Sequence, residues 1–150
     1  MRVGEELTSD TTNNMALQNV TRGDVFRICL DRSNGITPKK GDISRNKFFV
    51  VLGKDSQGNI YGGVIINSVI NQKLSPARKM LLMPVKASKY SFLEHDSFVD
   101  CACLMTVRSN GYATWQYKGR MDDEDVELIT GTVYESPFET KAKLEIFGIV

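Results

Sequence analysis

The sequence predicts an antiparallel α+β domain that is mostly β, with a sheet curled into a barrel and helices at the C-terminal end. Short apolar runs separated by turn residues fill the chain up to residue 107, and each run has the length and residue types of a strand. Helical patterns appear only after residue 121. Strands that precede helices, instead of alternating with them, favour an antiparallel sheet over a parallel one.

The composition is that of an ordinary globular domain. The chain has 150 residues, of which 41% are apolar and 25% are charged, enough for one core. The net charge of +1 creates no strong field toward nucleic acid, although a local basic groove is compatible with it. No apolar run approaches the roughly 20 residues that span a bilayer, and the N-terminus lacks the apolar segment of a secretory signal. We therefore expect a cytoplasmic protein without membrane contact.

The chain divides into an arm and a folded domain. Residues 1–20 are polar and rich in Thr, Asn and Asp, which predicts a flexible arm, and residues 21–150 form the domain. Apolar positions in residues 24–30 predict the first strand. Residues 31–46 contain Gly, Pro, Ser, Asn and basic residues, which predict a long loop, and loops of this length are often functional.

Two further runs predict a β-hairpin. Residues 47–53 are nearly continuous in apolar residues, as in a central strand, and residues 60–70 form the next strand after turn residues that include Gly58. Gly62 and Gly63 inside the second strand indicate a bulge or a sharp bend, which a small barrel needs at its corners.

Two more strands are predicted before the helices. Residues 79–88 form the third strand of this sheet, and Pro84 favours an edge position because proline lacks the N–H that a central strand uses. Residues 97–107 form a fourth strand.

The first C-terminal helix is predicted from its cap and its apolar face. Asp122 is a typical N-cap residue, and acidic residues fill the turn that follows it. Val126, Ile129 and Val133 lie at the spacing of one helical face, so we expect them to be buried.

A second helix is predicted over about residues 137–147. The sequence Ser-Pro-Phe-Glu at residues 136–139 is typical of a capping box with proline at the first helical position. Gly148 is typical of the residue that ends a helix.

The stretch FLEHDSFVDCACLMTV, at residues 92–107, contains the one histidine of the chain and two of its three cysteines. Cys101 and Cys103 share a face if the segment is a strand, and they are then expected to be reduced, buried and metal-free. Zinc needs more donors than this pair, and Cys29 and His95 would complete a set only if the fold brought them together. His95 is either a general base or a solvated turn residue.

Five segments in order resemble the MazF/PemK toxin family. They are GDVFRICL, RNKFFVVLG, YGGVIINS, SFVDCACLMTV and YKGRMDDEDVELITGTV, which begin at residues 23, 45, 61, 97 and 117. The resemblance implies an SH3-like antiparallel barrel with a C-terminal helix, commonly a homodimer. It also implies a sequence-specific endoribonuclease that an antitoxin protein neutralises. CcdB-like members of the same fold instead bind gyrase.

The resemblance also implies catalytic residues. Lys47 stands where the family has arginine, followed by Phe48 in place of proline, and Arg45 could substitute for that arginine. Asn67 and Ser68 correspond to the Thr-Ser at the end of a strand. Cleavage of this type uses no metal and no cofactor, because a base takes the 2′-hydroxyl proton and a cation stabilises charge on the phosphate. His95 suits the role of that base by its ordinary titration range.

Other residues are predicted to bind RNA. Basic side chains around the long loop would contact phosphates. In the segment NGYATWQYKGR, Trp115 would stack on bases and Lys118 would pair with a phosphate. Thr106 matches the Thr of the family's Arg-Thr motif, with Met105 at the arginine position. The candidates are Arg32, Lys39, Lys40, Thr106, Trp115 and Lys118. The alternatives are a solvated basic loop and an aromatic arm that packs on the barrel or at a dimer interface.

The predicted function is that of a toxin-like, metal-independent endoribonuclease that cleaves single-stranded RNA. Its expected partners are single-stranded RNA, an antitoxin protein and a second copy of the chain. The alternative is a non-catalytic binding module with the same fold, whose partner is nucleic acid or protein, including CcdB-like target binding.

Overall fold

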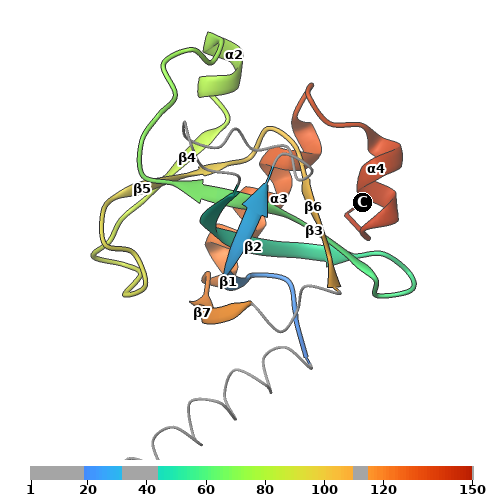
Figure 1. Ribbon diagram of the computed structural model, residues 1–150. Coiled ribbons are helices and arrows are strands. Elements are labelled where there is room, and N and C mark those ends of the chain that lie inside the picture. Colours follow the sequence, from blue (N-terminus) through green and yellow to red (C-terminus); the bar gives the residue numbers. More distant parts are fainter. Residues whose placement is uncertain (1–18, 32–43, 110–114, 150) are drawn as a thin grey trace, which may run out of the picture.

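The computed structural model of the protein describes residues 19–31, 44–109 and 115–149, which form a seven-stranded sheet and three helices (Figure 1). The strands are β1 (Asp24–Asp31), β2 (Ser44–Lys54), β3 (Ile60–Asn67), β4 (Leu82–Val85), β5 (Ser97–Asp100), β6 (Met105–Arg108) and β7 (Gln116–Arg120). The helices are α2 (Pro76–Lys79), α3 (Asp123–Glu135) and α4 (Lys141–Ile146). The arm predicted at residues 1–20 lies outside the described residues except for its last two.

Every pairing among the described strands is antiparallel, which confirms the predicted α+β class with mostly β content. The strand order is β4–β5–β3–β2–β1–β7, and β6 also pairs with β3. The predicted hairpin is confirmed by β2 and β3, which pair from Phe48 with Ile66 to Lys54 with Tyr61. The edge position of Pro84 is confirmed because β4 is the terminal strand.

β2 begins earlier than the sequence predicts. Leu30 pairs with Arg45 and Asp31 with Ser44, so the last residues of the predicted loop 31–46 belong to a strand. Ser44 and Arg45 are polar and lack the apolar alternation that predicts a strand. Pairing with β1 provides hydrogen-bond partners for their backbone N–H and C=O groups. Most of the rest of that loop lies outside the described residues.

The strand predicted at residues 79–88 is shortened by a helix that the pattern does not predict. The Ser75 hydroxyl accepts a hydrogen bond from the Arg78 N–H at 3.2 Å, and Pro76 follows this cap. This cap begins α2, a single helical turn that takes up the start of the predicted strand. The strand is therefore limited to Leu82–Val85.

A β-bulge lies in the hairpin, but on the strand opposite the predicted one. Val51 pairs with Gly63 and Gly53 with Gly62, so Leu52 of β2 is the extra residue. A Cβ atom at Gly53 would lie 1.9 Å from the carbonyl oxygen of Phe147, the residue that ends α4. The glycines therefore allow the end of α4 to approach the hairpin backbone.

The strand predicted at residues 97–107 is in fact two strands. Ile66 pairs with Val99 and Gly63 pairs with Met105, so three steps along β3 correspond to six steps along the other segment. Residues 101–104 leave the ladder between β5 and β6. The prediction that two cysteines of this segment share one strand face is therefore wrong.

Contacts with the helical region hold this interruption in place. The Leu104 N–H donates to the Glu139 carboxylate at 2.6 Å, and the Ser136 hydroxyl donates to the Ala102 carbonyl. The Lys143 ammonium donates to the Leu104 carbonyl at 3.0 Å. Backbone groups that lose their strand partners find new ones here, which makes the break possible.

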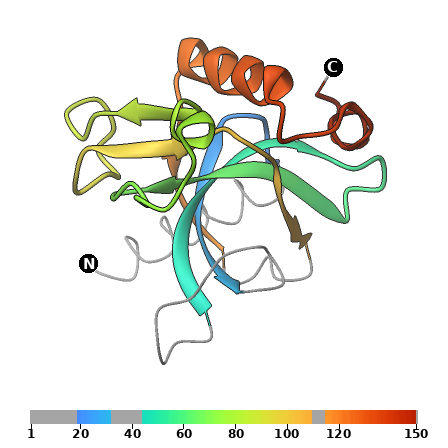
Figure 2. The same cartoon turned by 90° about the horizontal axis from the view of Figure 1, so that it is seen from above.

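α3 agrees with its prediction. The Asp122 carboxylate accepts a hydrogen bond from the Asp125 N–H at 2.8 Å, and Val126, Ile129 and Val133 are all buried. In Figure 2, α3 lies along one face of the sheet, with α4 on the same side.

The start of the second helix differs from its prediction. α4 begins at Lys141, after the Thr140 hydroxyl accepts a hydrogen bond from the Lys143 N–H at 3.2 Å. Ser136 and Glu139 do not form the predicted capping box because both side chains bind the interrupted strand. The predicted end is confirmed, since Gly148 has φ +74° and follows the C-cap Phe147.

Each face of the sheet carries a buried cluster. One cluster packs strand residues such as Val50 and Val64 against α3 and α4. A second cluster on the alternate strand positions includes Phe26, Phe49 and Trp115. None of the helices in the described part of the chain has the length and apolar character required to cross a membrane.

Candidate functional site

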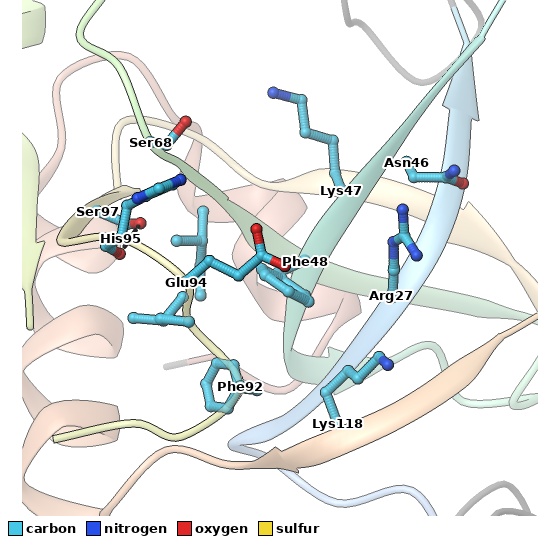
Figure 3. A pocket seen from close by; sticks show the side chains of 12 residues that line it. Arg27, Asn46, Lys47, Phe48, Ser68, Phe92, Glu94, His95, Ser97 and Lys118 are labelled. Carbon is cyan, nitrogen blue, oxygen red and sulfur yellow. Dashed lines mark hydrogen bonds between the residues drawn. The ribbon is translucent and has the colours of Figure 1, made fainter. Parts of the chain in front are cut away.

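A cavity of about 420 Å³ lies where β1, β2, the end of β3, the loop before β5 and β7 meet (Figure 3). We call it the central pocket. Its charged and titratable lining residues are Arg27, Lys47, Glu94, His95 and Lys118. Its polar residues are Asn46, Ser68 and Ser97, and its apolar residues are Phe48, Ile66, Phe92 and Leu93. Apolar walls with a few converging polar groups are typical of binding sites.

Lys47 and Asn67 meet across the β2–β3 hairpin. Phe48 pairs with Ile66, so Lys47 and Asn67 occupy the next positions along the two strands. The Lys47 ammonium donates to the Asn67 side-chain oxygen at 2.6 Å. Ser68 follows directly and lines the central pocket. Strand register therefore places a cation and two small polar side chains at one end of the hairpin.

The loop before β5 brings Glu94 and His95 into the central pocket, where Figure 3 shows them facing the strands that carry the cations. The loop is held at His95 and directly after it. The Ser97 hydroxyl donates to the His95 carbonyl at 2.7 Å, and the Asp96 carboxylate accepts from the Ala87 N–H at 2.9 Å. The latter bond lowers the pKa of Asp96, so this carboxylate keeps its charge in the turn.

Lys118 reaches the central pocket from a β-bulge in β7. Val25 pairs with Gly119 and Phe26 pairs with Tyr117, so Lys118 is the extra residue. Bulges change the direction of a side chain and recur beside active sites. Arg27 of β1 lies in the same wall of the central pocket.

The structure brings together five of the predicted site residues. Lys47, Ser68, His95 and Lys118 line the central pocket, and Asn67 binds Lys47. These residues come from β2, the end of β3, the loop before β5, and β7, segments far apart in the sequence.

Two other predicted residues lie elsewhere. Trp115 is only 2% exposed and its ring contacts Phe26 and Tyr61, so the predicted stacking on RNA bases does not fit its burial. Thr106 pairs with Gly62, at the end of β3 opposite Asn67, and it does not line the central pocket.

The remaining predicted residues come from the long basic segment. Arg32, Lys39 and Lys40 lie outside the described residues. Arg45 lies in β2, and its side chain is not described.

Four polar or charged lining residues are not predicted from the sequence, namely Arg27, Asn46, Glu94 and Ser97. Arg27 does carry a signal, since it is the one charged residue inside the apolar run at residues 25–30. Glu94 precedes the single histidine, and paired titratable groups are a common sign of acid–base chemistry.

The three cysteines are free thiols in different environments. Cys101 is fully buried, Cys103 is partly buried and Cys29 is exposed. Burial raises the pKa of Cys101 to about 12 and also raises that of Cys103. Within residues 19–31, 44–109 and 115–149, no three His, Cys, Asp or Glu side chains gather in a way that could hold a metal ion. The hypothetical set with Cys29 and His95 is therefore not assembled.

Comparison of the sequence with protein-family models and with curated proteins finds no match.

Proposed function

We propose that the protein is a metal-independent endoribonuclease of the MazF/PemK type that cleaves single-stranded RNA. One observation carries this proposal: cations and proton-transfer groups from distant segments converge on the central pocket. Lys47, Arg27 and Lys118 supply positive charge, and Glu94 and His95 supply groups that exchange protons. The three residues expected from the family motifs, Lys47, Asn67 and Ser68, lie at one end of the same hairpin.

The reaction moves two protons. The 2′-hydroxyl oxygen attacks the adjacent phosphorus while a base takes its proton, and the 5′-oxygen leaves with a proton from an acid. The products are a 2′,3′-cyclic phosphate and a 5′-hydroxyl end. His95 takes the 2′-hydroxyl proton in its neutral form. Glu94 is adjacent and is the second proton-transfer group of the central pocket.

The cations stabilise the phosphate during attack. Negative charge grows on the phosphoryl oxygens in the transition state, and a positioned cation lowers the energy of that state. Lys47 is the main candidate because it lines the central pocket and its ammonium group is held by Asn67. Arg27 and Lys118 approach from β1 and β7 and would bind phosphates of the same strand.

The proposal extends to fold, assembly and location. We propose that the antiparallel sheet belongs to the SH3-like barrel type, that two copies form a homodimer and that an antitoxin protein blocks the pocket in the cytoplasm. The pairing of one strand, β3, with β2, β5 and β6 supports a strongly bent sheet.

A direct test uses purified protein and a single-stranded RNA in a buffer with a chelator. We expect fragments that end in 2′,3′-cyclic phosphate, and growth arrest when the protein is expressed in cells. The double variant Lys47→Ala, Arg45→Ala removes two cations of β2 and should abolish both effects. Lys54→Ala is the matched control, because this exposed lysine of β2 does not line the central pocket.

A non-catalytic binding module is the second candidate. Lys47 favours it, because an ammonium group lacks the forked geometry with which arginine holds a phosphate. Intact RNA at high protein concentration, together with harmless expression, would select this candidate. Such a module would bind nucleic acid without cutting it, or bind a protein target as CcdB-like proteins do.

A further inference from the structure

A second cavity of about 520 Å³ adjoins the central pocket. We call it the second pocket. It lies between the segment before β5 and the end of β7, with the residues that lead from β7 into α3. Phe92 and Lys118 line both cavities, so these two side chains mark the boundary that the cavities share.

The second pocket has a wall of paired charges. The Lys89 ammonium lies 2.7 Å from the Asp122 carboxylate and 2.9 Å from that of Asp125. The Asp125 carboxylate also accepts a hydrogen bond from the Tyr90 hydroxyl. These contacts raise the pKa of Lys89 and tie its loop to the start of α3. The wall is therefore held in place, and its one cation and two carboxylates leave a net charge of −1.

Lys118 differs from the other cations of the second pocket. Arg120 lies 3.3 Å from Asp24 and 3.5 Å from Asp123, and Lys89 is paired as described. Lys118 forms no ion pair with a described residue. Among the described residues, it is therefore the cation without an ion-pair partner at the junction of the two pockets. An anionic group that crosses this junction would neutralise it.

Phe92 presents its ring at the same junction. Its ring centroid is 5.6 Å from that of Phe48 and 5.4 Å from that of Tyr90, so it connects the walls of the two pockets. A Cβ atom at residue 119 would lie 3.5 Å from the ring. Gly119 has φ +147°, which disfavours other residues, and its lack of a side chain leaves this edge of the ring uncovered.

We infer that the second pocket is a nucleotide subsite next to the scissile position. In this arrangement Lys118 binds the phosphate next to the scissile one, and Phe92 contacts the base beyond that phosphate. The ligand class is single-stranded RNA of at least three nucleotides, because two nucleotides flank the scissile phosphate and the third occupies the second pocket. An aromatic ring beside an unpaired cation fits such a strand, because every base has a face that stacks and every linkage carries a charge. This inference rests on the proposed function.

The test compares short and long RNA that cannot be cut. The probes are a dinucleotide and a hexanucleotide with 2′-O-methyl groups, titrated against the full chain by fluorescence anisotropy. We expect the hexanucleotide to bind the wild type about tenfold more tightly than the dinucleotide. The variants Phe92→Leu and Lys118→Gln should lose most of this gain. Lys118→Gln should also reduce the slope of log affinity against log salt by about 0.7.

Lys54→Gln is the matched control, because Lys54 is exposed and lines neither pocket. If the hexanucleotide binds but both variants behave like this control, the subsite is wrong while the proposed function stands. Equal weakening of both probes also overturns the subsite, because the residues then act only in the central pocket. If the wild type binds neither probe, the proposed function fails and the subsite fails with it. Lys118 is exposed, so its variant remains informative if Phe92→Leu does not fold.

Discussion

The ammonium nitrogen of Lys47 lies 2.6 Å from the side-chain oxygen of Asn67, across the β2–β3 hairpin and beside the central pocket. The two residues are separated along the chain, and only strand pairing brings them together. Because the amide oxygen already holds the ammonium group in one orientation, the lysine side chain loses less conformational entropy when a phosphate binds to it.

Lys47→Met should remove most of the RNA cleavage. The side chain keeps its length but loses its charge, so the transition state loses one positioned cation. By comparison with the loss of one oxyanion donor, we expect a decrease in kcat of roughly 100- to 1,000-fold. Single-turnover cleavage of a labelled RNA measures it. Lys54→Met serves as control, and similar rates for the two variants would exclude Lys47 from the chemistry.

The pH dependence of cleavage should identify the role of His95. A general base works only in its deprotonated form. Activity should therefore fall toward acidic pH in the wild type. In a His95→Gln variant the remaining activity should no longer decrease at acidic pH. If the variant instead loses a decrease of activity at alkaline pH, His95 donates a proton. In that case Glu94→Gln should remove the decrease at acidic pH.

The cysteines should react with alkylating reagents in order of their exposure. Cys29 is exposed, whereas Cys101 is buried and its pKa is raised to about 12, so Cys101 holds almost no thiolate at neutral pH. Iodoacetamide labelling followed by mass spectrometry should modify Cys29 first and Cys101 only after unfolding. Equal labelling rates in the native protein would contradict the buried position of Cys101.

Alanine substitutions at two glycines should change stability in opposite directions. Gly53→Ala would place a Cβ atom 1.9 Å from the Phe147 carbonyl oxygen and should cost about 1–3 kcal/mol or more of unfolding free energy. Gly131 lies on the exposed side of α3 with nothing within 4 Å of its Cβ position. Gly131→Ala should therefore add about 0.5–1 kcal/mol through helix propensity. Urea unfolding measures both, and a neutral Gly53→Ala would refute the close approach of α4.

Tyr90→Phe should destabilise the protein in a way that depends on pH. The hydroxyl donates to Asp125 and accepts from the Asp122 N–H, so its loss should cost about 1–3 kcal/mol near neutral pH. Burial, and then the bond to Asp125, raise the pKa of Tyr90 to about 12. A tyrosine in the unfolded chain titrates at about pH 10. The stabilisation by the Tyr90 hydroxyl is therefore complete below that pH and is lost as the pH rises toward 12.

Urea unfolding of the two proteins at pH 8 and pH 11 checks this expectation. The difference in stability between wild type and variant should shrink at the higher pH. Tyr134→Phe is the control, since this residue is 37% exposed and a surface change of this size is usually small. A difference that stays constant between the two pH values would contradict the assigned role of the hydroxyl.

The sequence alone determined the elements whose signals are local. Alternating or continuous apolar runs predicted β1, β2 and β3, and the turn at Gly58 predicted their hairpin. A good N-cap and a single apolar face predicted α3, with its buried Ile129. Gly148 predicted the end of α4, because only glycine adopts a positive φ there without strain.

Other elements were decided by contacts that a local pattern does not contain. Residues 97–107 have the apolar character of one strand, but Ser136 and Glu139 bind the backbone of their middle and divide them. The same two contacts remove the capping box predicted at residues 136–139. Trp115 illustrates the same limit, because its place in the core depends on Phe26 and Tyr61, which lie far away in the sequence.

The central pocket shows both contributions. The sequence singled out Lys47, His95 and Lys118 by residue type and motif, and all three line the pocket. Their convergence was decided only by the tertiary structure, through the register of β2 and β3, the turn before β5 and the bulge in β7. The physical reason is that propensity and capping act over a few neighbouring residues. A site built from five segments depends instead on backbone pairing and packing between residues that are distant in the chain.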